Sequence, residues 1–399
     1  MAPADPRRGA VVLWHKDTSF RLLRLAFASA ASVVVVALLL MAVSPYAPQL
    51  AVLQHGAALG NGSAAPCTPA LNITWYQNAT LAPAPLPPSH ADSDGEVIIE
   101  LFQTLGLSTV WKSVANITIE GDSGEPEGMV RLGDDRYVVS SGEWLERTQR
   151  YGSIINGTDR TAGTGFAHLV VYDGRGKRVA DATITREGED EYHNGGIDYD
   201  GEFIWGAVGQ YRPNTTGYAY KADPATLRAR PVVRYADHLG AIVHDTHDDT
   251  ITCLNWGSRN ASTFDLAALD PAARAAPALP PSSVVRNPSY MVDYQDCKWL
   301  GRSARYDGRS VMLCSGLATV GGYRLGGVAL VDVATMTPLA EVPISLESAL
   351  GTRMTQNPVD VSVVDGRLRF YWMPDHHNST LYIYEAQPDS PFQYGGGSR

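Results

Sequence analysis

The sequence predicts an all-β fold: a single β-propeller carried on an N-terminal transmembrane anchor. A hairpin unit recurs five times along the chain, a second strand pair follows it in most copies, and a long apolar run lies near the N-terminus. Charged residues make up only 19% of the chain, and its 38 Gly and 25 Pro suit short strands joined by turns better than long solvated helices.

The hairpin units share a central Asp-Gly or other acidic turn, which is a strong signal for a tight β-hairpin. Their first strands begin near Gly128, Gly195, Gly240, Cys297 and Val359. Outer strand pairs follow at 168–184, 218–235 and 327–344, and shortened ones at 262–266 and 380–386. Two hairpins make a four-stranded blade, and repeated blades close into a propeller around a central channel.

We count five blades, with a sixth, degenerate blade and a β-sandwich as the alternatives. The last blade lacks an outer strand, while Thr109–Ile119 has strand character and precedes the first blade. We therefore expect this segment to complete the last blade and close the ring. The third blade keeps only 262–266 of its outer pair, followed by an Ala/Pro-rich loop at 267–283.

The apolar run at 25–43 contains no charged residue, and at ~1.5 Å per helical residue it is long enough to cross a bilayer core. Five basic residues precede it, and none follows until Lys112. The positive-inside rule then predicts a single-pass type II membrane protein whose C-terminal domain is luminal or extracellular. A cleaved signal peptide is the alternative.

This pattern divides the chain into five parts. Residues 1–24 are a basic cytosolic tail, 25–43 the signal anchor, and 44–107 a Pro/Ala-rich glycosylated stalk with a short helix within 96–107. Residues 108–387 form the propeller, and 388–399 a flexible C-terminal tail.

Eight Asn-X-Ser/Thr sequons lie on the C-terminal side of the apolar run, which predicts an N-glycosylated protein of the secretory pathway. The acceptor residues are Asn61, Asn72, Asn78, Asn116, Asn156, Asn214, Asn260 and Asn378.

The four cysteines lie on that same side, where disulfides are allowed. Cys297 and Cys314 flank the fourth hairpin turn symmetrically, so they would face each other across the strand pair and could form a disulfide. Two unpaired buried thiols, or pairing of Cys297 with Cys253, are equally compatible with the pattern.

Nucleic acid is disfavoured as a partner, because the net charge is -10 and the chain has no basic stripe. The membrane, through residues 25–43, is the partner that the sequence predicts.

Polar residues stand just before each inner strand, and one turn of the ring would bring them together at one mouth of the channel. They are Glu127, His193, Asn194, His238, Gln295, Asp296, Gln356 and Asn357, with Arg353 nearby. One interpretation is a pocket for a small polar or carbohydrate-like ligand, bound by Asn194, Gln295, Gln356 and Arg353.

A second interpretation is a metal site. Glu127, Asp296 and Asn357 would supply oxygen ligands to Ca²⁺ or another divalent ion, and His193 or His238 would act as the catalytic base. The alternative for each residue is a structural one: it satisfies backbone groups at the strand ends and ties the blades together.

Several motifs in order resemble a family of fungal and bacterial proteins of unknown function (domain-of-unknown-function family 6454). The motifs are His-Asn-Gly-Gly-Ile-Asp-Tyr-Asp-Gly at 193–201, Tyr-Arg-Pro-Asn at 211–214, Trp-Gly-Ser-Arg at 256–259, Asp-Tyr-Gln-Asp-Cys at 293–297 and Met-Thr-Gln-Asn-Pro at 354–358. The resemblance covers roughly 110–387 and implies a propeller-like repeat fold, with no established activity. Pro-Glu-Gly at 126–128 is similar to the metal-binding start of gluconolactonase-type propellers, but the remaining ligands of that family are not matched.

Three functions follow as hypotheses. The first is a binding propeller with its ligand at the channel mouth. The second is a metal-dependent hydrolase of the lactonase or esterase kind. The third is an interaction scaffold with no ligand in the channel.

Overall fold

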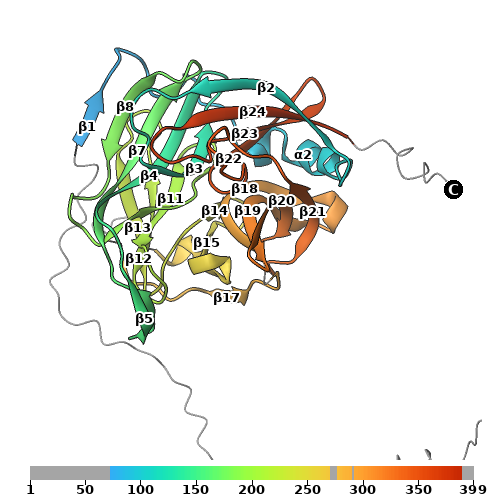
Figure 1. The fold of residues 1–399 in the computed structure, drawn as a ribbon. Helices are drawn as coiled ribbons and strands as arrows, with labels where there is room; N and C mark the ends of the chain where they lie inside the picture. Colours follow the sequence, from blue (N-terminus) through green and yellow to red (C-terminus); the bar gives the residue numbers. More distant parts are fainter. Residues whose placement is uncertain (1–71, 270–275, 290–291, 389–399) are drawn as a thin grey trace, which may run out of the picture. The chain divides into compact units, whose positions relative to one another are not determined.

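The computed structural model describes residues 72–269, 276–289 and 292–388, and five antiparallel sheets in this part of the chain form a five-blade β-propeller (Figure 1). The count of five blades made from the sequence is confirmed. In each blade the first strand lies at the channel, and successive hairpins lead outward.

Every blade has four strands in the order expected from the repeated hairpins, and two blades carry an extra strand. From the channel outward, the first blade contains β3 (Glu125–Arg131), β4 (Arg136–Glu146), β7 (Thr164–Asp173) and β8 (Arg178–Thr183), with β1 (Asn72–Trp75) added at its edge. The second contains β9 (Glu191–Asn194) and β10 (Asp198–Tyr199), which both pair with β11 (Ile204–Gln210), then β12 (Gly217–Ala222) and β13 (Ala229–Tyr235).

The remaining three blades follow the same order. The third contains β14 (Ile242–Asp245), β15 (Thr250–Leu254), β16 (Asn260–Asp265) and β17 (Ser283–Arg286). The fourth contains β18 (Val292–Ser303), β19 (Arg309–Val320), β20 (Tyr323–Asp332) and β21 (Pro338–Ile344). The fifth contains β22 (Val359–Val364), β23 (Arg367–Trp372), β24 (Thr380–Gln387) and β2 (Val110–Thr118).

The ring closes through β2, as the sequence predicts. This strand pairs antiparallel with β24, from Val110 opposite Gln387 to Thr118 opposite Thr380. Figure 1 shows the two strands side by side although they come from opposite ends of the domain. The outermost strand of the third blade, β17, was not predicted, because the Ala/Pro-rich loop before it hides the end of the repeat.

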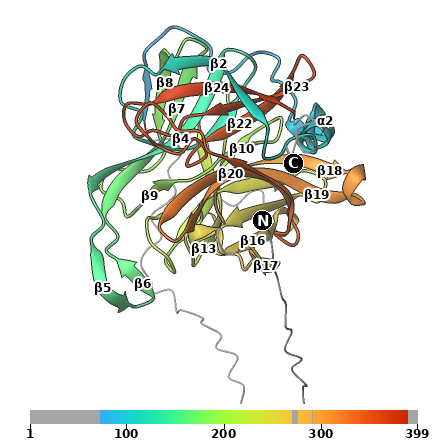
Figure 2. The same ribbon diagram turned by 45° about the vertical axis from the view of Figure 1, so that its right-hand side comes forward.

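Local turn chemistry explains the hairpins. Asp365 and Gly366 form the two-residue connection between β22 and β23, with φ values of 50° and 73°. Positive φ at both central residues defines the type I′ turn, whose twist matches that of paired strands. A further hairpin, β5 (Arg150–Ile155) and β6 (Thr158–Arg160), is inserted between β4 and β7 and extends away from the sheets in Figure 2.

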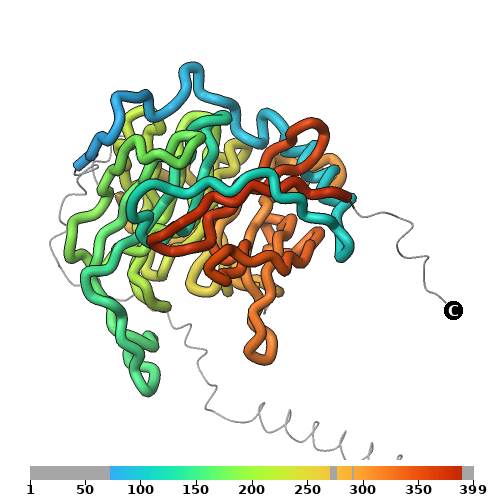
Figure 3. The backbone as a smooth tube through the Cα atoms, turned by 45° about the horizontal axis from the view of Figure 1, so that its top comes forward, coloured from blue at the N-terminus to red at the C-terminus, as the bar shows by residue number. Residues whose placement is uncertain are grey.

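The expected stalk boundary at residue 107 is wrong for the part of the stalk that the structure describes. Helix α2 (Gly95–Phe102) buries Ile98, Ile99 and Phe102 completely against the fourth and fifth blades. This spacing places the three side chains on one face of a helix. Leu81 is likewise buried against the first and second blades, and Figure 3 shows the blue segment running across the propeller.

A disulfide joins Cys297 and Cys314, one of the pairings that the sequence left open. The two residues are direct partners in the register of β18 and β19, with their Cα atoms 4.1 Å apart. Cys253 is a buried free thiol, and Cys67 lies outside the described residues.

The predicted anchor at 25–43, the tail at 1–24, the sequon at Asn61 and the C-terminal residues from 389 on also lie outside the described residues. Within the described part of the chain, no helix combines the length and the apolar character needed to span a membrane.

Candidate functional site

The side chains of the candidate site gather at the end of the channel where the inner strands begin, which we call the entry face. The second strand of each blade runs antiparallel to the first, so the loop after it returns to this same end. The entry face is therefore built from the starts of the inner strands and from the loops after β11, β15 and β23.

His193, on β9, lies at the centre of the entry face. Its Nε2 atom is 3.6 Å from Oε1 of Glu127, and its ring stacks on that of Tyr211 with the centroids 5.1 Å apart. Among the described residues, Nδ1 is buried and has no hydrogen-bond partner beyond its own main chain. Burial opposes the imidazolium, but the attraction of Glu127 and Glu125 outweighs burial and raises the pKa of His193 above its usual value.

His238 is the second imidazole of the entry face, and its ring centroid lies 5.2 Å from that of His193. Its Nδ1 donates a hydrogen bond of 2.7 Å to the carbonyl of Gln210, which leaves Nε2 as the unprotonated nitrogen of a neutral ring. Burial, reinforced by repulsion from His193, lowers the pKa of His238 to about 3. The two neighbouring imidazoles are therefore driven towards opposite charge states.

Carboxylates surround His193. Burial raises the pKa of Asp293 to about 6, helped by the negative charge of Glu127 and opposed by Arg259 and by a hydrogen bond from Gln295. Gln295, two residues further along β18, contacts the carboxylate of Asp293.

Asn357 lies at the other side of this face. Its Nδ2 is 2.9 Å from Nε2 of His376, whose Nδ1 is 3.2 Å from Oε1 of Glu125. Burial lowers the pKa of His376, but the carboxylates of Glu125 and Glu127 raise it by more. The pKa of His376 is therefore higher than its usual value. The sequence does not predict His376 at this site, because the β23–β24 connection carries no motif of its own.

Three residues of the site were missed or undervalued at the sequence level: Arg160, Tyr211 and Trp256. The guanidinium of Arg160 lies 4.7 Å from the ring centroid of Trp256 and 5.5 Å from that of Tyr211. Trp256 also contacts His238 edge to face, with centroids 5.1 Å apart. Tyr211 and Trp256 could have been found, because they follow β11 and β15 in the loops that return to the entry face. Arg160 comes from the inserted hairpin, for which the repeat gives no signal.

Three of the expected ligand-binding residues do not join this group. Asn194 is fully buried between the first and second blades, where Nδ2 donates to the carbonyl of His168 and Oδ1 accepts from the hydroxyl of Tyr220. Arg353 pairs with Glu347 at 3.1 Å. Gln356 accepts a hydrogen bond from Arg324. Both polar atoms of Asn194 are thus satisfied inside the protein, whereas the contacts of Arg353 and Gln356 lie at the surface.

The expected metal ligands do not converge either. Asp296 is completely buried on the channel axis, where its oxygens accept from Lys298 and from the main-chain N–H groups of Met129, Ile197 and Val359. Glu127 pairs with His193, and Asn357 contacts His376. Among the described residues, no group of three or more His, Cys, Asp or Glu side chains is arranged to hold a metal ion.

Comparison with known proteins identifies the family but no activity. No curated protein matches the chain. Among solved structures, a luciferin-regenerating enzyme aligns with a TM-score of 0.37 and 12% identity, covering 71% of this chain and 98% of its own. The WD40 domain of coronin from Toxoplasma gondii aligns with a TM-score of 0.29 and 8% identity, covering 72% and 90%. Neither likeness is close enough to bear on function.

The family comparison covers the whole propeller together with the segment that precedes β2. Residues 87–389 match a family described as "Family of unknown function (DUF6454)". The matched region begins within the segment that the sequence assigned to a stalk and that the structure packs onto the blades. The chain belongs to this family of unknown function, DUF6454.

Proposed function

We propose that this protein binds a small polar or carbohydrate-like ligand at the entry face. The observation that carries the proposal is the buried Nδ1 of His193, which has no hydrogen-bond partner among the described residues beyond its own main chain. An unsatisfied buried polar atom is costly, so a ligand group or an ordered water that fills this position gains free energy.

The chemistry around His193 suits a ligand with several hydroxyl groups. The carboxylates of Glu127 and Asp293 accept hydrogen bonds, the amide of Gln295 both donates and accepts, and the imidazolium of His193 donates. The ring of Tyr211 contacts both the imidazole of His193, on which it stacks, and the guanidinium of Arg160.

A second candidate, a hydrolase of the lactonase or esterase kind, is favoured by the imidazole pair. The neutral His238 has the protonation state of a general base, while the raised pKa of His193 favours the state of a general acid. In this candidate the rings, 5.2 Å apart, act on a ligand bound at the same face.

The cellular setting that we propose is a type II, N-glycosylated membrane protein of the secretory pathway. It is supported by the apolar run at 25–43 and by the surface positions of the sequons. Six of the seven sequon asparagines in the described residues are exposed, and Asn260 is half-buried. Deglycosylation with an endoglycosidase should increase the gel mobility of the protein expressed in a eukaryotic cell. Unchanged mobility would contradict the secretory assignment.

The central experiment compares His193→Ala with His247→Ala, because His247 lies in an exposed turn and its side chain is 66% exposed. Both purified full-length variants are applied to an array of immobilised mono- and oligosaccharides and to a thermal-shift panel of neutral, amino and acidic sugars. We expect wild type and His247→Ala to bind the same sugars, and His193→Ala to lose at least about tenfold in affinity, which corresponds to one buried hydrogen bond to a charged group.

The melting temperature separates the ligand-binding role from a structural one. His193→Ala should melt within about 2 °C of the wild type, because the free energy recovered by removing a buried, unsatisfied nitrogen offsets the packing that is lost with the ring. A large loss of stability, or undiminished sugar binding by the variant, contradicts the proposal. Hydrolysis of chromogenic esters or lactones that is lost in His238→Ala would establish the second candidate.

A further inference from the structure

A second, separate chamber lies at the opposite end of the channel. It is a cavity of about 190 Å³ between the far ends of the inner strands and the segment 87–94, which we call the strap. Lys298 donates hydrogen bonds to Asp296 and to the carbonyl of Ile197, both at 2.7 Å. These groups occupy the channel axis, so the chamber is distinct from the entry face.

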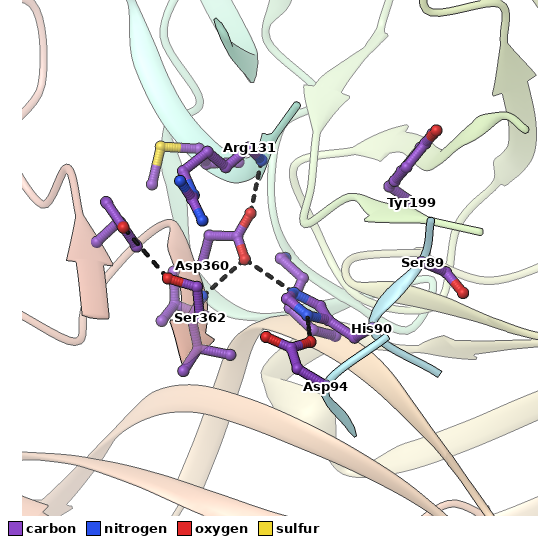
Figure 4. A network of polar contacts seen from close by, with 12 residues as sticks. Ser89, His90, Asp94, Arg131, Tyr199, Asp360 and Ser362 are labelled. Carbon is purple, nitrogen blue, oxygen red and sulfur yellow. Dashed lines mark hydrogen bonds and ion pairs between the residues drawn. The ribbon is translucent and has the colours of Figure 1, made fainter. Parts of the chain in front are cut away.

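The strap is fixed to the propeller by specific polar contacts (Figure 4). His90 lies between two carboxylates, with Nδ1 2.9 Å from Asp94 and Nε2 3.1 Å from Asp360. The other oxygen of Asp360 accepts from the main-chain N–H of Arg131 at 2.5 Å. The hydroxyl of Tyr199 donates to the carbonyl of Pro87 at 2.9 Å. The strap is therefore a fixed wall of the chamber.

The chamber is large enough to hold water or a small solute. One ordered water needs about 10–15 Å³ of such space, so a cavity of about 190 Å³ takes many waters or a small solute. Lys298, Asp198 and Asp360 line it and are at most 3% exposed. Charged groups with so little access to bulk solvent require compensation from neighbours or from a bound ligand.

The charges in and around the wall do not balance. Three side chains carry positive charge: His90, Arg131 and Lys298. Five carboxylates line the chamber or pair with these cations: Asp94, Asp134, Asp198, Asp296 and Asp360. Five negative groups and three positive ones leave an excess of two carboxylates. The first belongs to the pair Asp94 and Asp360, which share the single positive charge of His90.

Asp198 is the second of the two carboxylates in excess. Its Oδ1 accepts from its neighbour's main-chain N–H at 2.9 Å, and its Oδ2 accepts from the N–H groups of His244 and Trp299, both at 3.3 Å. Among the described residues, none forms an ion pair with Asp198. Burial raises the pKa of Asp198 to about 7, and the attraction of Lys298 only partly offsets this rise. A positive charge placed in the chamber would restore the ionised carboxylate.

We propose that this chamber binds a small monovalent cation, a metal ion or a primary ammonium group, against the carboxylate of Asp198. One carboxylate without an ion pair matches one positive charge, and Ser362, whose hydroxyl also contacts that of Tyr371, is part of the polar wall. This site is independent of the ligand proposed for the entry face.

The test is a thermal melt of the purified full-length protein in chloride salts at constant ionic strength. Rubidium and methylammonium are compared with choline, whose bulky head group does not fit beside Asp198. At a concentration tenfold above half-saturation, the bound cation should raise the melting temperature by about 2 °C relative to choline. A shift with rubidium alone identifies a metal ion, and a shift with methylammonium alone identifies an ammonium ligand.

Asp198→Asn should abolish the shift, whereas Asp307→Asn should keep it, because Asp307 is exposed in a turn where Asn tolerates the positive φ of 55°. The anomalous signal of rubidium in wild-type crystals locates a metal ion without any variant, and we expect its peak beside Asp198. The proposal is overturned if neither cation differs from choline, if Asp198→Asn folds and keeps the shift, or if the rubidium peak lies outside the chamber. His193→Ala should keep the shift, which separates this site from the entry face.

Discussion

Asp296 and Lys298 form a 2.7 Å ion pair on the propeller axis, and through it the fourth blade is joined to three others. The carboxylate accepts main-chain N–H groups of the first, second and fifth blades, and the ammonium donates to the carbonyl of Ile197 in the second. Both side chains are at most 1% exposed. This pair holds together the inner strands that also carry the entry face.

Lys298→Met should destabilise the protein by about 3–5 kcal/mol, because it leaves the carboxylate of Asp296 buried without its cation. Lys177→Met is the matched control, since Lys177 forms an ion pair with Glu120 at the surface, where the loss should stay below about 1 kcal/mol. Urea unfolding of the two variants measures the difference. Equal losses would show that the axial pair has no special role.

Glu127→Gln should lower the pKa of His193, because the carboxylate is what overcomes the cost of burying the imidazolium. The fall in the pKa of His193 is followed by NMR titration of the histidine ring signals. Glu187→Gln, at an exposed position, should leave the titration unchanged. If the pKa of His193 stays the same in Glu127→Gln, the 3.6 Å contact does not control its charge.

The stability of the protein should fall as the pH rises from about 5 to 8. Burial raises the pKa of Asp198 to about 7 and that of Asp296 to about 6, from ordinary values of 3.8. Their stabilising contribution is complete below pH 4 and is lost as the pH rises through the folded-state values. His90 adds to the fall above pH 6.5, because its pKa is raised to about 10.

His238 acts in the opposite direction below pH 6.5, because burial lowers its pKa and the unfolded chain then binds the extra proton. The contribution of Asp198 is therefore measured as a difference. Melting temperatures of wild type and Asp198→Asn are recorded across pH 5–8, and the variant should show a decline smaller by at least about 2 °C. Parallel curves would mean that Asp198 does not titrate in this range.

Phe102→Ala should destabilise the protein by about 3–5 kcal/mol, since this ring is fully buried between α2 and the blades. Val97→Ala, on the exposed side of the same helix, should cost less than about 1 kcal/mol. Chemical denaturation of both variants gives the comparison. A small loss for Phe102→Ala would restore the interpretation of this segment as a stalk.

Adjacent residues show where sequence reasoning reached its limit. His193 and Asn194 are neighbours on β9, and so are Gln295 and Asp296 on β18. Side chains of a regular strand alternate between its two faces, so only one of His193 and Asn194 can point to the entry face. At Gln295 the register of β18 shifts, and the irregularity sets this residue apart from Asp296. The sequence shows that all four residues are polar. Which residue of each pair faces the entry face depends on the register of β9 on β11 and of β18 on β19.

The sequence by itself determined the all-β class, the five hairpin repeats and a closing strand within Thr109–Ile119. It could do so because period-two hydrophobicity and Asp-Gly turns are local signals, read without knowledge of distant residues. Only the tertiary structure decided that Asp296 joins the blades, that His376 and Arg160 belong to the entry face, and that the strap closes a second chamber. Those facts depend on contacts between segments far apart in the chain, and their energies come from burial that no local pattern records.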